Sequence, residues 1–534
     1  MSSITLSHIA CLTPDRRILF SDLNLSFRKE RAGLVGRNGV GKTTLLKLVL
    51  GELEPSAGSV TVNGTLGFLK QTVQVDRQET LADLFGVRDS LATLRRAEMG
   101  EATLEELAEA DWTLEERMTV ALARVGLDAG ADTRLGTLSG GQRTRAGLAA
   151  SIFAEPTFLL LDEPTNNLDR EGRDAVIALL EGWRAGAIVI SHDRELLERM
   201  DAIVELTSLG ATRYGGNWTH YRERKAIELE AAQHDLAHAE KRAADTKRKV
   251  QMATERKARR DAAGARKSAR GDLPRILLGA RKNNAEASGG QGARLAERQR
   301  TEATEAVASA RARIEVLQQL SIVLPPSGLA AGQTVLRLDR VTGGYDAASP
   351  LIHDLSLTLT GPQRLAVTGS NGSGKTTLLN MITGQMTPSA GTIWVTQSLA
   401  MLDQRVGILD TQASILDNFM RLNPGSDEQA CRSALAGFLF RADASLQLVG
   451  TLSGGQMLRA GLACILGGTQ PPQLLMLDEP TNHLDIESVE AIEGGLAAYD
   501  GALILVSHDE SFLANVGVDH RLDLTAHSHQ VMTP

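Results

Sequence analysis

The sequence predicts an α/β protein in which two similar halves, each built on a parallel sheet covered by helices, are joined by a long helical hairpin. Three observations lead to this fold class. The same ordered set of short motifs occurs twice along the 534 residues. Within each half, short apolar runs alternate with helical stretches, which is typical of parallel strands covered on both faces. Between the halves the composition shifts to Ala, Glu, Lys, Arg and Gln, which favours long exposed helices.

Length and composition limit the class of protein. A chain of 534 residues is too long for one hydrophobic core, so we expect two or three domains. The sequence contains no apolar run of about 18 residues, the length that a membrane-spanning helix needs, so it predicts no such helix. The first residues do not resemble a signal peptide. The three cysteines, Cys11, Cys431 and Cys464, are far apart and fit reduced core residues of a cytoplasmic protein better than a disulfide framework or a metal site.

Each half contains a phosphate-binding loop. The first is Gly36-Arg37-Asn38-Gly39-Val40-Gly41-Lys42-Thr43, and the second is Gly369-Ser370-Asn371-Gly372-Ser373-Gly374-Lys375-Thr376. Both fit G-x-x-x-x-G-K-[ST], in which backbone N–H groups surround the phosphates of a nucleotide, the lysine neutralises phosphate charge and the Thr hydroxyl ligates Mg²⁺. Buried strands at 32–35 and 365–368 should precede the loops, and helices starting at Thr44 and Thr377 should follow them and direct their N-termini at the anion. A glycine-rich turn that matches by chance would not be expected twice in the same context.

The spacing of the repeat shows where the halves differ in length. Lys42 to Lys375 is 333 residues and Gln71 to Gln404 is also 333, whereas Ser139 to Ser453 is 314. The first half therefore carries 19 more residues (333 − 314) between its Gln and its Ser. We expect this extra length in the acidic helical region around 83–132.

Two adjacent acids end a buried apolar strand in each half. They are Asp162-Glu163 and Asp478-Glu479, and each pair is followed by Pro-Thr-Asn. An aspartate at this place can hold Mg²⁺, and the neighbouring glutamate can orient or deprotonate an attacking water as a general base. Alone such a pair is a weak signal, but behind a phosphate loop in both halves it is specific.

A Leu-Ser-Gly-Gly-Gln string opens an alanine- and leucine-rich helix in each half. The residues concerned are Ser139, Gly140, Gly141 and Gln142 in the first half, and Ser453, Gly454, Gly455 and Gln456 in the second. Serine is a good N-cap, and the glycines let backbone N–H groups approach an anion closely. An ordinary helix start would explain one copy more easily than two.

The middle of the chain is basic, although the protein as a whole has a net charge of −8. Residues 222–320 hold 23 Lys and Arg against 14 Asp and Glu, and residues 241–282 hold 15 against 4. We expect a first helix to about Ala262, an irregular tip, and a second helix over 292–320. The predicted domains are 1–217, the linker 218–326, and 327–534. The linker is a candidate nucleic-acid contact, the alternative being a solvated spacer.

In both halves the motifs follow one order: phosphate loop, Gln, Leu-Ser-Gly-Gly-Gln, Asp-Glu and Ser-His-Asp. This order resembles a pair of ATP-binding-cassette (ABC) nucleotide-binding domains over nearly all of 1–215 and 330–534. The strings that start at Glu163 and Glu479, Glu-Pro-Thr-Asn-Asn-Leu-Asp and Glu-Pro-Thr-Asn-His-Leu-Asp, resemble the ABC-F branch in particular. So does the arrangement of two cassettes in one chain with a charged helical linker and no membrane domain.

The resemblance implies that each ATP is held between the cassettes of one monomer. The first ATP would lie between Lys42, Thr43, Gln71, Asp162, Glu163 and His192 on one side and Ser453 and Gly455 on the other. The second would lie between Lys375, Thr376, Gln404, Asp478, Glu479 and His508 on one side and Ser139 and Gly141 on the other. In the family the glutamates act as bases, the histidines contact the γ-phosphate, and the Thr, Gln and Asp side chains surround Mg²⁺, with no other metal.

Two departures from the family pattern suggest that the two sites differ. Tyr345 stands where the family stacks an aromatic ring on adenine, whereas Cys11-Leu12-Thr13-Pro14 of the first half offers none. Asn167 also replaces the histidine found at His483. The first nucleotide is therefore a candidate for a different mode of binding, and equal turnover at the two sites is not assumed.

ABC-F proteins act on ribosomes near the tRNA exit site, with the linker reaching toward the peptidyl tRNA and the peptidyl-transferase centre. The resemblance therefore implies an ATP-gated translation factor whose basic linker contacts rRNA and tRNA, or a factor that protects ribosomes from antibiotics. An ATPase that acts on DNA structure or repair is one alternative. The ATPase component of a transporter with separate membrane subunits is another, but the basic linker has no evident role there.

Overall fold

The computed structural model describes residues 2–13, 18–69, 78–208, 210–268, 298, 301–302, 304–309, 324–346, 349–403, 406–482, 484–525 and 531–532. The chain divides into two compact units. One unit consists of Met1–Tyr221 and Leu320–Pro534 and holds both halves of the repeat. The other unit is Arg222–Gln319, the segment between the halves.

The first half combines a three-stranded antiparallel sheet with a six-stranded sheet. The strand orders are β2-β1-β4 and β5-β6-β7-β3-β8-β9, and the second sheet is parallel except for β9, which runs antiparallel to β8. The strands are β1 (Ser3–Leu12), β2 (Ile18–Phe27), β3 (Arg31–Val35), β4 (Ala57–Asn63), β5 (Leu66–Leu69), β6 (Phe158–Asp162), β7 (Gly186–Ile190), β8 (Ala202–Thr207) and β9 (Gly210–Gly215). The helices are α1 (Lys42–Leu50), α2 (Leu81–Leu84), α3 (Arg88–Glu98), α4 (Leu104–Glu109), α5 (Leu114–Arg124), η1 (Leu135–Thr137), α6 (Gly140–Phe153), α7 (Arg170–Gly182) and α8 (Arg194–Leu197).

The second half repeats this topology with the strand orders β11-β10-β13 and β14-β15-β16-β12-β17-β18. Its strands are β10 (Thr334–Gly343), β11 (Ile352–Thr360), β12 (Arg364–Thr368), β13 (Ala390–Val395), β14 (Leu399–Leu402), β15 (Leu474–Asp478), β16 (Ala502–Val506), β17 (His520–Asp523) and β18 (Val531–Met532). Its helices are α11 (Lys375–Ile382), α12 (Ile415–Leu422), α13 (Glu428–Gly437), η2 (Ala442–Leu446), η3 (Val449–Thr451), α14 (Gly454–Leu466), α15 (Ile486–Ala498) and α16 (Glu510–Val516). The α/β class predicted from the sequence is confirmed.

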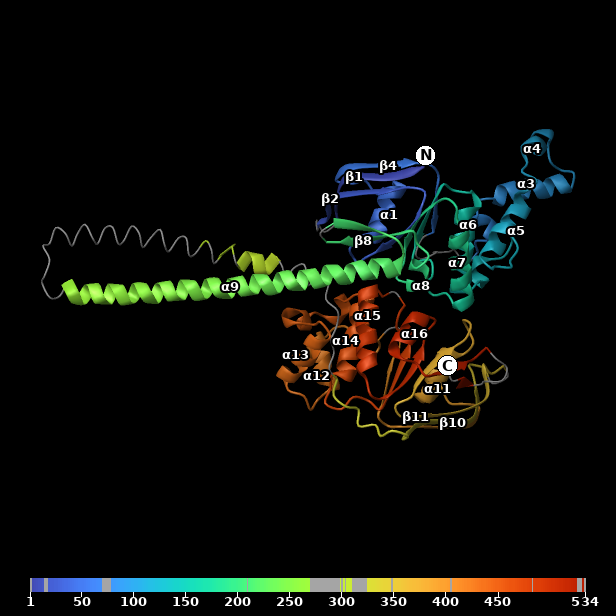
Figure 1. Ribbon diagram of the computed structural model, residues 1–534. Helices are drawn as coiled ribbons and strands as arrows, with labels where there is room; N and C mark the ends of the chain where they lie inside the picture. The colour runs from blue at the N-terminus through green and yellow to red at the C-terminus, as the bar shows by residue number, and fades with distance from the viewer. Residues whose placement is uncertain are drawn as a thin grey trace. The chain divides into compact units, whose positions relative to one another are not determined.

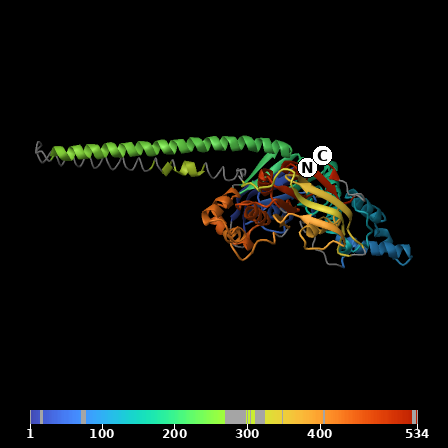
Figure 2. The ribbon, with the colours of Figure 1, turned by 90° about the horizontal axis from the view of Figure 1, so that it is seen from below.

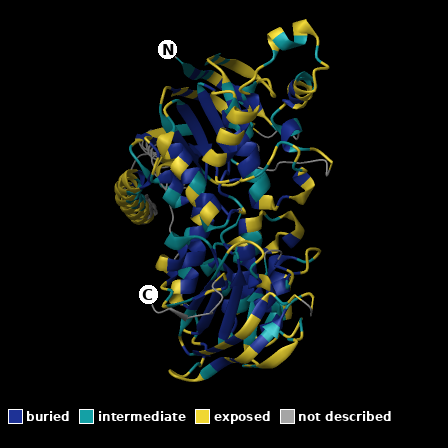
Figure 3. Cartoon of the chain, turned by 90° about the vertical axis from the view of Figure 1, so that its right-hand side faces the viewer, coloured by how far each residue is buried: buried dark blue, intermediate teal, exposed yellow. Residues whose placement is uncertain are grey.

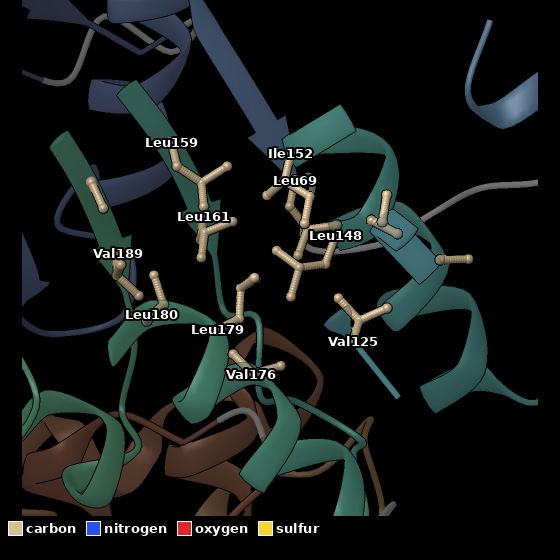
Figure 4. Packing of buried hydrophobic residues seen from close by; sticks show 14 of the residues in the cluster. Leu69, Val125, Leu148, Ile152, Leu159, Leu161, Val176, Leu179, Leu180 and Val189 are labelled. Atoms are coloured by element: carbon tan, nitrogen blue, oxygen red, sulfur yellow. The ribbon is translucent and has the colours of Figure 1, made fainter. Parts of the chain in front are cut away.

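The central strands are buried on both faces, which explains why their sequences are continuous apolar runs. Every residue of β6 and β7 is buried, and the central strands of both halves are dark blue in Figure 3. One face of the six-stranded sheet of the first half packs on α6 and α7, as Figure 4 shows. Leu69, Leu159, Leu161 and Val189 of the sheet lie against Leu148 and Ile152 of α6 and Val176, Leu179 and Leu180 of α7. The opposite face, with Leu160 and Ile188, packs with Leu45 and Leu46 of α1. The sheets thus fix the ends of strands from which the site residues project.

The halves differ most in a helical region that lies between two equivalent bridges. Thr80 pairs with Arg134 in the first half, and Ser414 pairs with Leu448 in the second. Thr80 and Ser414 are also N-caps of equivalent helices, α2 and α12. The bridges enclose intervals of 54 residues (134 − 80) and 34 residues (448 − 414), a difference of 20. The structure therefore places the extra length of the first half in the region expected from the sequence. This region contains α3, α4 and α5 in the first half, and the equivalent region of the second half contains α13 and η2.

The segment between the halves begins with one long helix, α9 (Trp218–Ser268), of 51 residues. It is drawn as one uninterrupted helix in Figures 1 and 2, and at about 1.5 Å per residue it is about 76 Å long. The expected end at Ala262 was too early, because α9 continues through Gly264 to Ser268, and no proline interrupts it. Most of the expected second helix and the tip lie outside the described residues. Among the residues that the structure describes, no helix combines the length and the apolar character needed to cross a membrane.

Candidate functional site

Each phosphate loop joins a buried strand to a helix, as its motif requires. Gly41 and Gly374 are the N-caps of α1 and α11 and have φ angles of 106° and 97°. A Cβ atom on Gly41 would lie 2.7 Å from Cζ of Phe20, so the position requires glycine for its conformation and for its space. The helices begin at the lysines, two residues before the expected starts at Thr44 and Thr377.

The two lysines lie across their own loops. Lys42 donates from Nζ to the carbonyl oxygens of Gly36 (2.5 Å) and Arg37 (3.3 Å). Lys375 donates in the same way to Gly369 (2.7 Å) and Ser370 (3.1 Å). Burial lowers the pKa of both lysines, although neighbouring carboxylates oppose the shift. An anion in the loop would compensate this buried positive charge better than carbonyl dipoles do.

A hydroxyl and a carboxylate meet at the start of each helix. Thr43 donates from Oγ1 to Oδ2 of Asp162, and Thr376 donates to Oδ2 of Asp478, both at 2.9 Å. Burial raises the pKa of both aspartates, and the threonine hydrogen bond opposes this shift. Two neighbouring oxygen donors, one of them anionic, fit a hard cation such as Mg²⁺ that keeps several waters. Gln71 and Gln404, the remaining residues expected around the metal, lie outside the described residues.

Glu163 and Glu479 adopt a left-handed backbone conformation directly after β6 and β15. Their φ angles are 53° and 49°, values that are strained for a residue with a side chain. A backbone hydrogen bond of 2.9 Å to the next strand, at Ile190 and Val506, holds each of them in place. Burial raises the pKa of Glu163 to about 8 and that of Glu479 to about 7. Such carboxyls can exchange a proton with water near neutral pH, as a general base requires.

A buried histidine faces each glutamate. Nε2 of His192 lies 3.1 Å from Oε1 of Glu163, and Nε2 of His508 lies 3.5 Å from Oε1 of Glu479. The angles are unsuitable for hydrogen bonds, so both ring nitrogens of His192 and Nε2 of His508 are buried without a hydrogen-bond partner among the described residues. Burial lowers the pKa of His192 to about 3 and that of His508 to about 4, so both rings are neutral at pH 7. Buried polar atoms of this kind are expected to bind a ligand group.

The second phosphate loop faces the first half of the chain. A cavity of 290 Å³ is lined by Ser139, Gly140, Gly141, Thr165, Asn167, Leu168 and Arg173 from the first half, and by Asn371, Glu479, Thr481, Asn482, His508 and Asp509 from the second. Asn371 donates from its backbone N to Asp169 (3.4 Å) and from its side chain to the carbonyl of Asn167 (3.2 Å). A Cβ atom on Gly141 would lie 3.6 Å from Nδ2 of Asn371. The Leu-Ser-Gly-Gly-Gln string of one half therefore lies beside the phosphate loop of the other.

The first phosphate loop has equivalent contacts with the second half, and one that differs. The backbone N of Asn38 donates to Asp485 at 2.9 Å, as Asn371 does to Asp169. Arg37 also forms an ion pair with Glu487 at 2.5 Å, whereas Ser370 occupies the equivalent place in the second loop. A Cβ atom on Gly455 would lie 2.8 Å from Oγ of Ser488, three residues after Asp485. Among the described residues, the first loop thus has an ion pair with the opposite half at a position where the second loop has an uncharged serine.

The Leu-Ser-Gly-Gly-Gln strings begin helices α6 and α14, as expected. Ser139 accepts a hydrogen bond from the backbone N of Gln142 (3.2 Å), and the Gln142 side chain accepts one from the backbone N of Ser139 (2.9 Å). Ser453 and Gln456 form the same pair of bonds at 3.3 and 3.0 Å. The predicted N-cap role of the serines is confirmed. Four glycines of these motifs have no atom of the described residues within 4 Å of an added Cβ, so their described surroundings leave room for a ligand; they are Gly39, Gly140, Gly372 and Gly454.

Tyr345 is 74% exposed, so its ring is free to stack on a planar group. In the first half, Leu12 and Ile18 are exposed large apolar side chains near the corresponding place, at 47% and 66%. Residues 14–17 between them lie outside the described residues, as does His483. At this position the second half therefore exposes an aromatic ring, whereas the described residues of the first half expose aliphatic side chains.

Some contact residues were not singled out from the sequence. Asp169 and Asp485 bind the backbone of the opposite loop, but in the sequence each is marked only as the last residue of the string that starts at Glu163 or Glu479. Arg173 and Arg194 reach the opposite half, yet no pattern in the sequence marks an arginine that does so. The left-handed glutamates also had no signal, because neighbouring residues do not specify that conformation.

The comparisons with known proteins agree with this geometry. The family model described as "ABC transporter" matches residues 20–166 and 352–482. The tylosin resistance ATP-binding protein TlrC of Streptomyces fradiae is 34% identical, over 93% of this chain and 92% of that protein. The energy-dependent translational throttle protein EttA of Mycobacterium tuberculosis is 30% identical, over 93% and 87%. The ATP-binding protein Uup of Escherichia coli is also 30% identical, over 91% and 74%.

Among solved structures, the RNase-L inhibitor aligns with a TM-score of 0.59 over 97% of this chain and 87% of that chain. Its identity is 17%, so it supports the fold alone. Two matches to one nucleotide-binding family, and relatives aligned over almost the whole chain, settle the classification. The chain belongs to the ABC-F family of ATP-binding-cassette proteins, and it is an ATPase.

Proposed function

We propose that ATP, bound with Mg²⁺ at two sites between the cassettes, gates the association of this protein with the ribosome. The observation that carries the proposal is the pairing of each phosphate loop with the opposite half, through Asn38 and Asp485 at one site and Asn371 and Asp169 at the other. One relative is named a translational throttle protein and another a tylosin resistance protein. In the proposed role the chain is a cytoplasmic monomer that acts on translation or protects ribosomes from an antibiotic.

The site residues have the following proposed roles. Lys42 and Lys375 turn from their loop carbonyls to the phosphates and neutralise charge that develops on them. Thr43 and Asp162, like Thr376 and Asp478, hold Mg²⁺, which supplies charge neutralisation when bound. Glu163 and Glu479 accept a proton from the attacking water. Tyr345 stacks on the adenine of the second ATP.

The remaining site residues contact the γ-phosphate from both sides. Each neutral ring, His192 and His508, can donate one hydrogen bond from a buried ring nitrogen that has no partner among the described residues. The serines and glycines of the opposite string supply hydroxyl and backbone N–H groups. A γ-phosphate bound by both cassettes favours their closed arrangement, because a ligand shifts a population by its difference in affinity for the two states. Hydrolysis removes that shared group and favours opening.

The described part of α9 offers a cationic surface. Lys241, Arg242, Lys247, Arg248 and Lys249 are all exposed, and they lie in the basic stretch predicted to contact RNA. Lysine and arginine bind phosphates with release of counterions, so this contact weakens as salt increases. Because aromatic residues are few in this stretch, we propose recognition of RNA shape and backbone rather than base stacking.

The test of gating is the double variant Glu163→Gln/Glu479→Gln. It keeps the shape of both sites but removes the proposed bases, so we expect it to bind ATP without turnover and to co-sediment with ribosomes of its host. Glu116→Gln/Glu428→Gln, at two exposed glutamates, is the matched control and should behave as wild type. Sedimentation of the first variant free of ribosomes at saturating ATP would contradict the proposal.

The test of the RNA contact is the salt dependence of ribosome binding. Arg248→Gln/Lys249→Gln should lower the slope of log K against log salt by about 1 to 2, since each phosphate contact contributes close to one unit. Arg337→Gln/Arg441→Gln removes two exposed cations outside α9 and should leave the slope unchanged. Equal slopes for both variants would exclude α9 as the phosphate contact. Growth of a susceptible host that expresses the protein, at graded drug concentrations, distinguishes protection from a role in ordinary translation.

A further inference from the structure

One buried arginine connects the histidine loops of the two ATP sites. Arg173 lies in α7 of the first half and is 8% exposed. Its Nε and Nη2 atoms donate to Oδ2 of Asp193 at 3.0 and 2.6 Å. Asp193 follows His192 directly and is itself fixed as the N-cap of α8, where it accepts from the backbone N of Glu195 and Leu196. The arginine is therefore held rigidly on the first half.

The remaining guanidinium donor of Arg173 crosses to the second half. Its Nη1 atom donates to the backbone carbonyl of His508 at 2.6 Å, across 335 residues of sequence. Arg173, His508 and Glu479 all line the same cavity. Because this bond fixes the main chain of His508, it limits where the imidazole ring and its Nε2 atom can lie relative to Glu479.

The first site lacks an equivalent arginine. The repeat offset of 316 residues (508 − 192) relates Arg173 to Val489. Val489 belongs to the hydrophobic core of the second half and is 4% exposed. A valine side chain has no hydrogen-bond donor, so it cannot bind the carbonyl of His192 as Arg173 binds that of His508.

We propose that Arg173 is a positioning residue for the second ATP site, where it holds His508 in place for hydrolysis from a fixed point on the first half. The inference rests on the catalytic roles proposed above for Glu479 and His508. It assigns to the two sites different requirements: the second site needs a side chain of the other half to order its histidine loop, and the first site does not. It also makes the Arg173–Asp193 pair a direct link between the two histidine loops.

The test measures each site separately. Glu163→Gln leaves the second site as the active one, and Glu479→Gln leaves the first. In the Glu163→Gln background, Arg173→Met should lower kcat by about 10- to 100-fold, because small displacements of a positioned group have effects of this size. The KM for ATP should change by less than about threefold, since all three guanidinium nitrogens of Arg173 already donate to Asp193 and His508. Arg173→Lys keeps one cationic donor and should recover part of kcat.

The same substitution in the Glu479→Gln background controls for damage to the fold. There Arg173→Met should change kcat by less than about threefold, whereas general destabilisation would affect both backgrounds equally. Arg170→Met is the matched control, because Arg170 lies on the same helix and its ion pairs among the described residues are with Asp174 and Glu195 of its own half. Its charge acts on His508 and Glu510 without a bond to them, so this variant removes a nearby charge and leaves the bond of Arg173 intact. An equal loss in both backgrounds, or no loss in the Glu163→Gln background, would overturn the proposal.

Hydrogen exchange gives a readout that does not depend on the catalytic roles. Arg173→Met should speed amide exchange at 507–510 in protein with intact glutamates, and Arg170→Met should not. Unchanged exchange at 507–510 would overturn the positioning role. If instead the exchange result holds but neither Glu→Gln variant lowers turnover, the proposed catalytic roles fail and the positioning of His508 by Arg173 stands.

Discussion

A second ion pair between the halves, Arg194 with Glu493, gives a quantitative test of the buried interface. Arg194 begins α8 and Glu493 lies in α15, and both side chains are 10% exposed. The pair is bidentate, with Nη1–Oε1 and Nη2–Oε2 distances of 2.7 and 3.1 Å. Burial raises the pKa of Glu493, and the hydrogen bonds of Arg194 oppose that shift. Each charge therefore depends on the other for its compensation.

Arg194→Met leaves a buried carboxylate without its arginine. The loss in free energy of unfolding from the unpaired charge cannot exceed the free energy needed to protonate Glu493. For a carboxyl with an ordinary pKa near 4.5, protonation at pH 7 requires about 3 kcal/mol. We expect Arg194→Met to lower the free energy of unfolding by about 3 kcal/mol at pH 7. The loss should be smaller at pH 5, because protonation is then nearly free. Glu493→Met should cost about 3 to 5 kcal/mol at either pH, because arginine cannot lose its proton.

The double variant Arg194→Met/Glu493→Met removes both charges and fills similar volume. It should lie within about 2 kcal/mol of wild type, since a buried pair replaced by apolar side chains is often neutral. Urea unfolding of nucleotide-free protein, followed by far-UV circular dichroism, measures all four members of the cycle. Arg199→Met/Glu181→Met, at an exposed pair within one half, is the control and should change stability by less than about 1 kcal/mol. A double variant as unstable as the sum of its single variants would refute the coupling.

Three further predictions concern the ATP sites. Glu479→Gln should stabilise nucleotide-free protein relative to wild type, by an amount that grows as the pH rises from about 4.5 to about 7. The reason is that the folded state binds the proton of Glu479 more tightly than the unfolded state does. Thermal unfolding at pH 5 and 7.5 measures the difference in stability between the two proteins, and a difference that is the same at both pH values would contradict the prediction. Gly41→Ala should abolish nucleotide binding at the first loop. Gly39→Ala, which meets no described residue within 4 Å, should weaken binding only about tenfold through its positive φ. Binding of a fluorescent ATP analogue ranks the two variants. Thr43→Val with Thr376→Val should raise the Mg²⁺ concentration for half-maximal ATPase activity by about tenfold, and an unchanged magnesium titration would remove the hydroxyls from the metal site.

The expectations that the structure bears out were those set by local sequence. A strand, a glycine loop and a helix follow one another because each of these stretches has residues that favour that local conformation. Ser139 caps α6 because its hydroxyl is adjacent to the free N–H groups of the first turn. The error at the end of α9 has the same origin. Between Ala262 and Ser268 only Gly264 has a low helix propensity, and a single glycine inside a helix is tolerated, so the sequence there contains no strong stop signal.

The order of motifs in the sequence was enough to determine a duplicated nucleotide-binding protein, its phosphate loops and its paired acids, because each of these is a chemical property of a few consecutive residues. The tertiary structure alone decided which residues meet across the halves. Arg173 touches the main chain of His508, and Asp485 touches the main chain of Asn38, because α7 of one half and the start of α15 of the other lie against loops of the opposite half. Contacts between residues more than 300 positions apart depend on the packing of whole domains, and no local pattern specifies them.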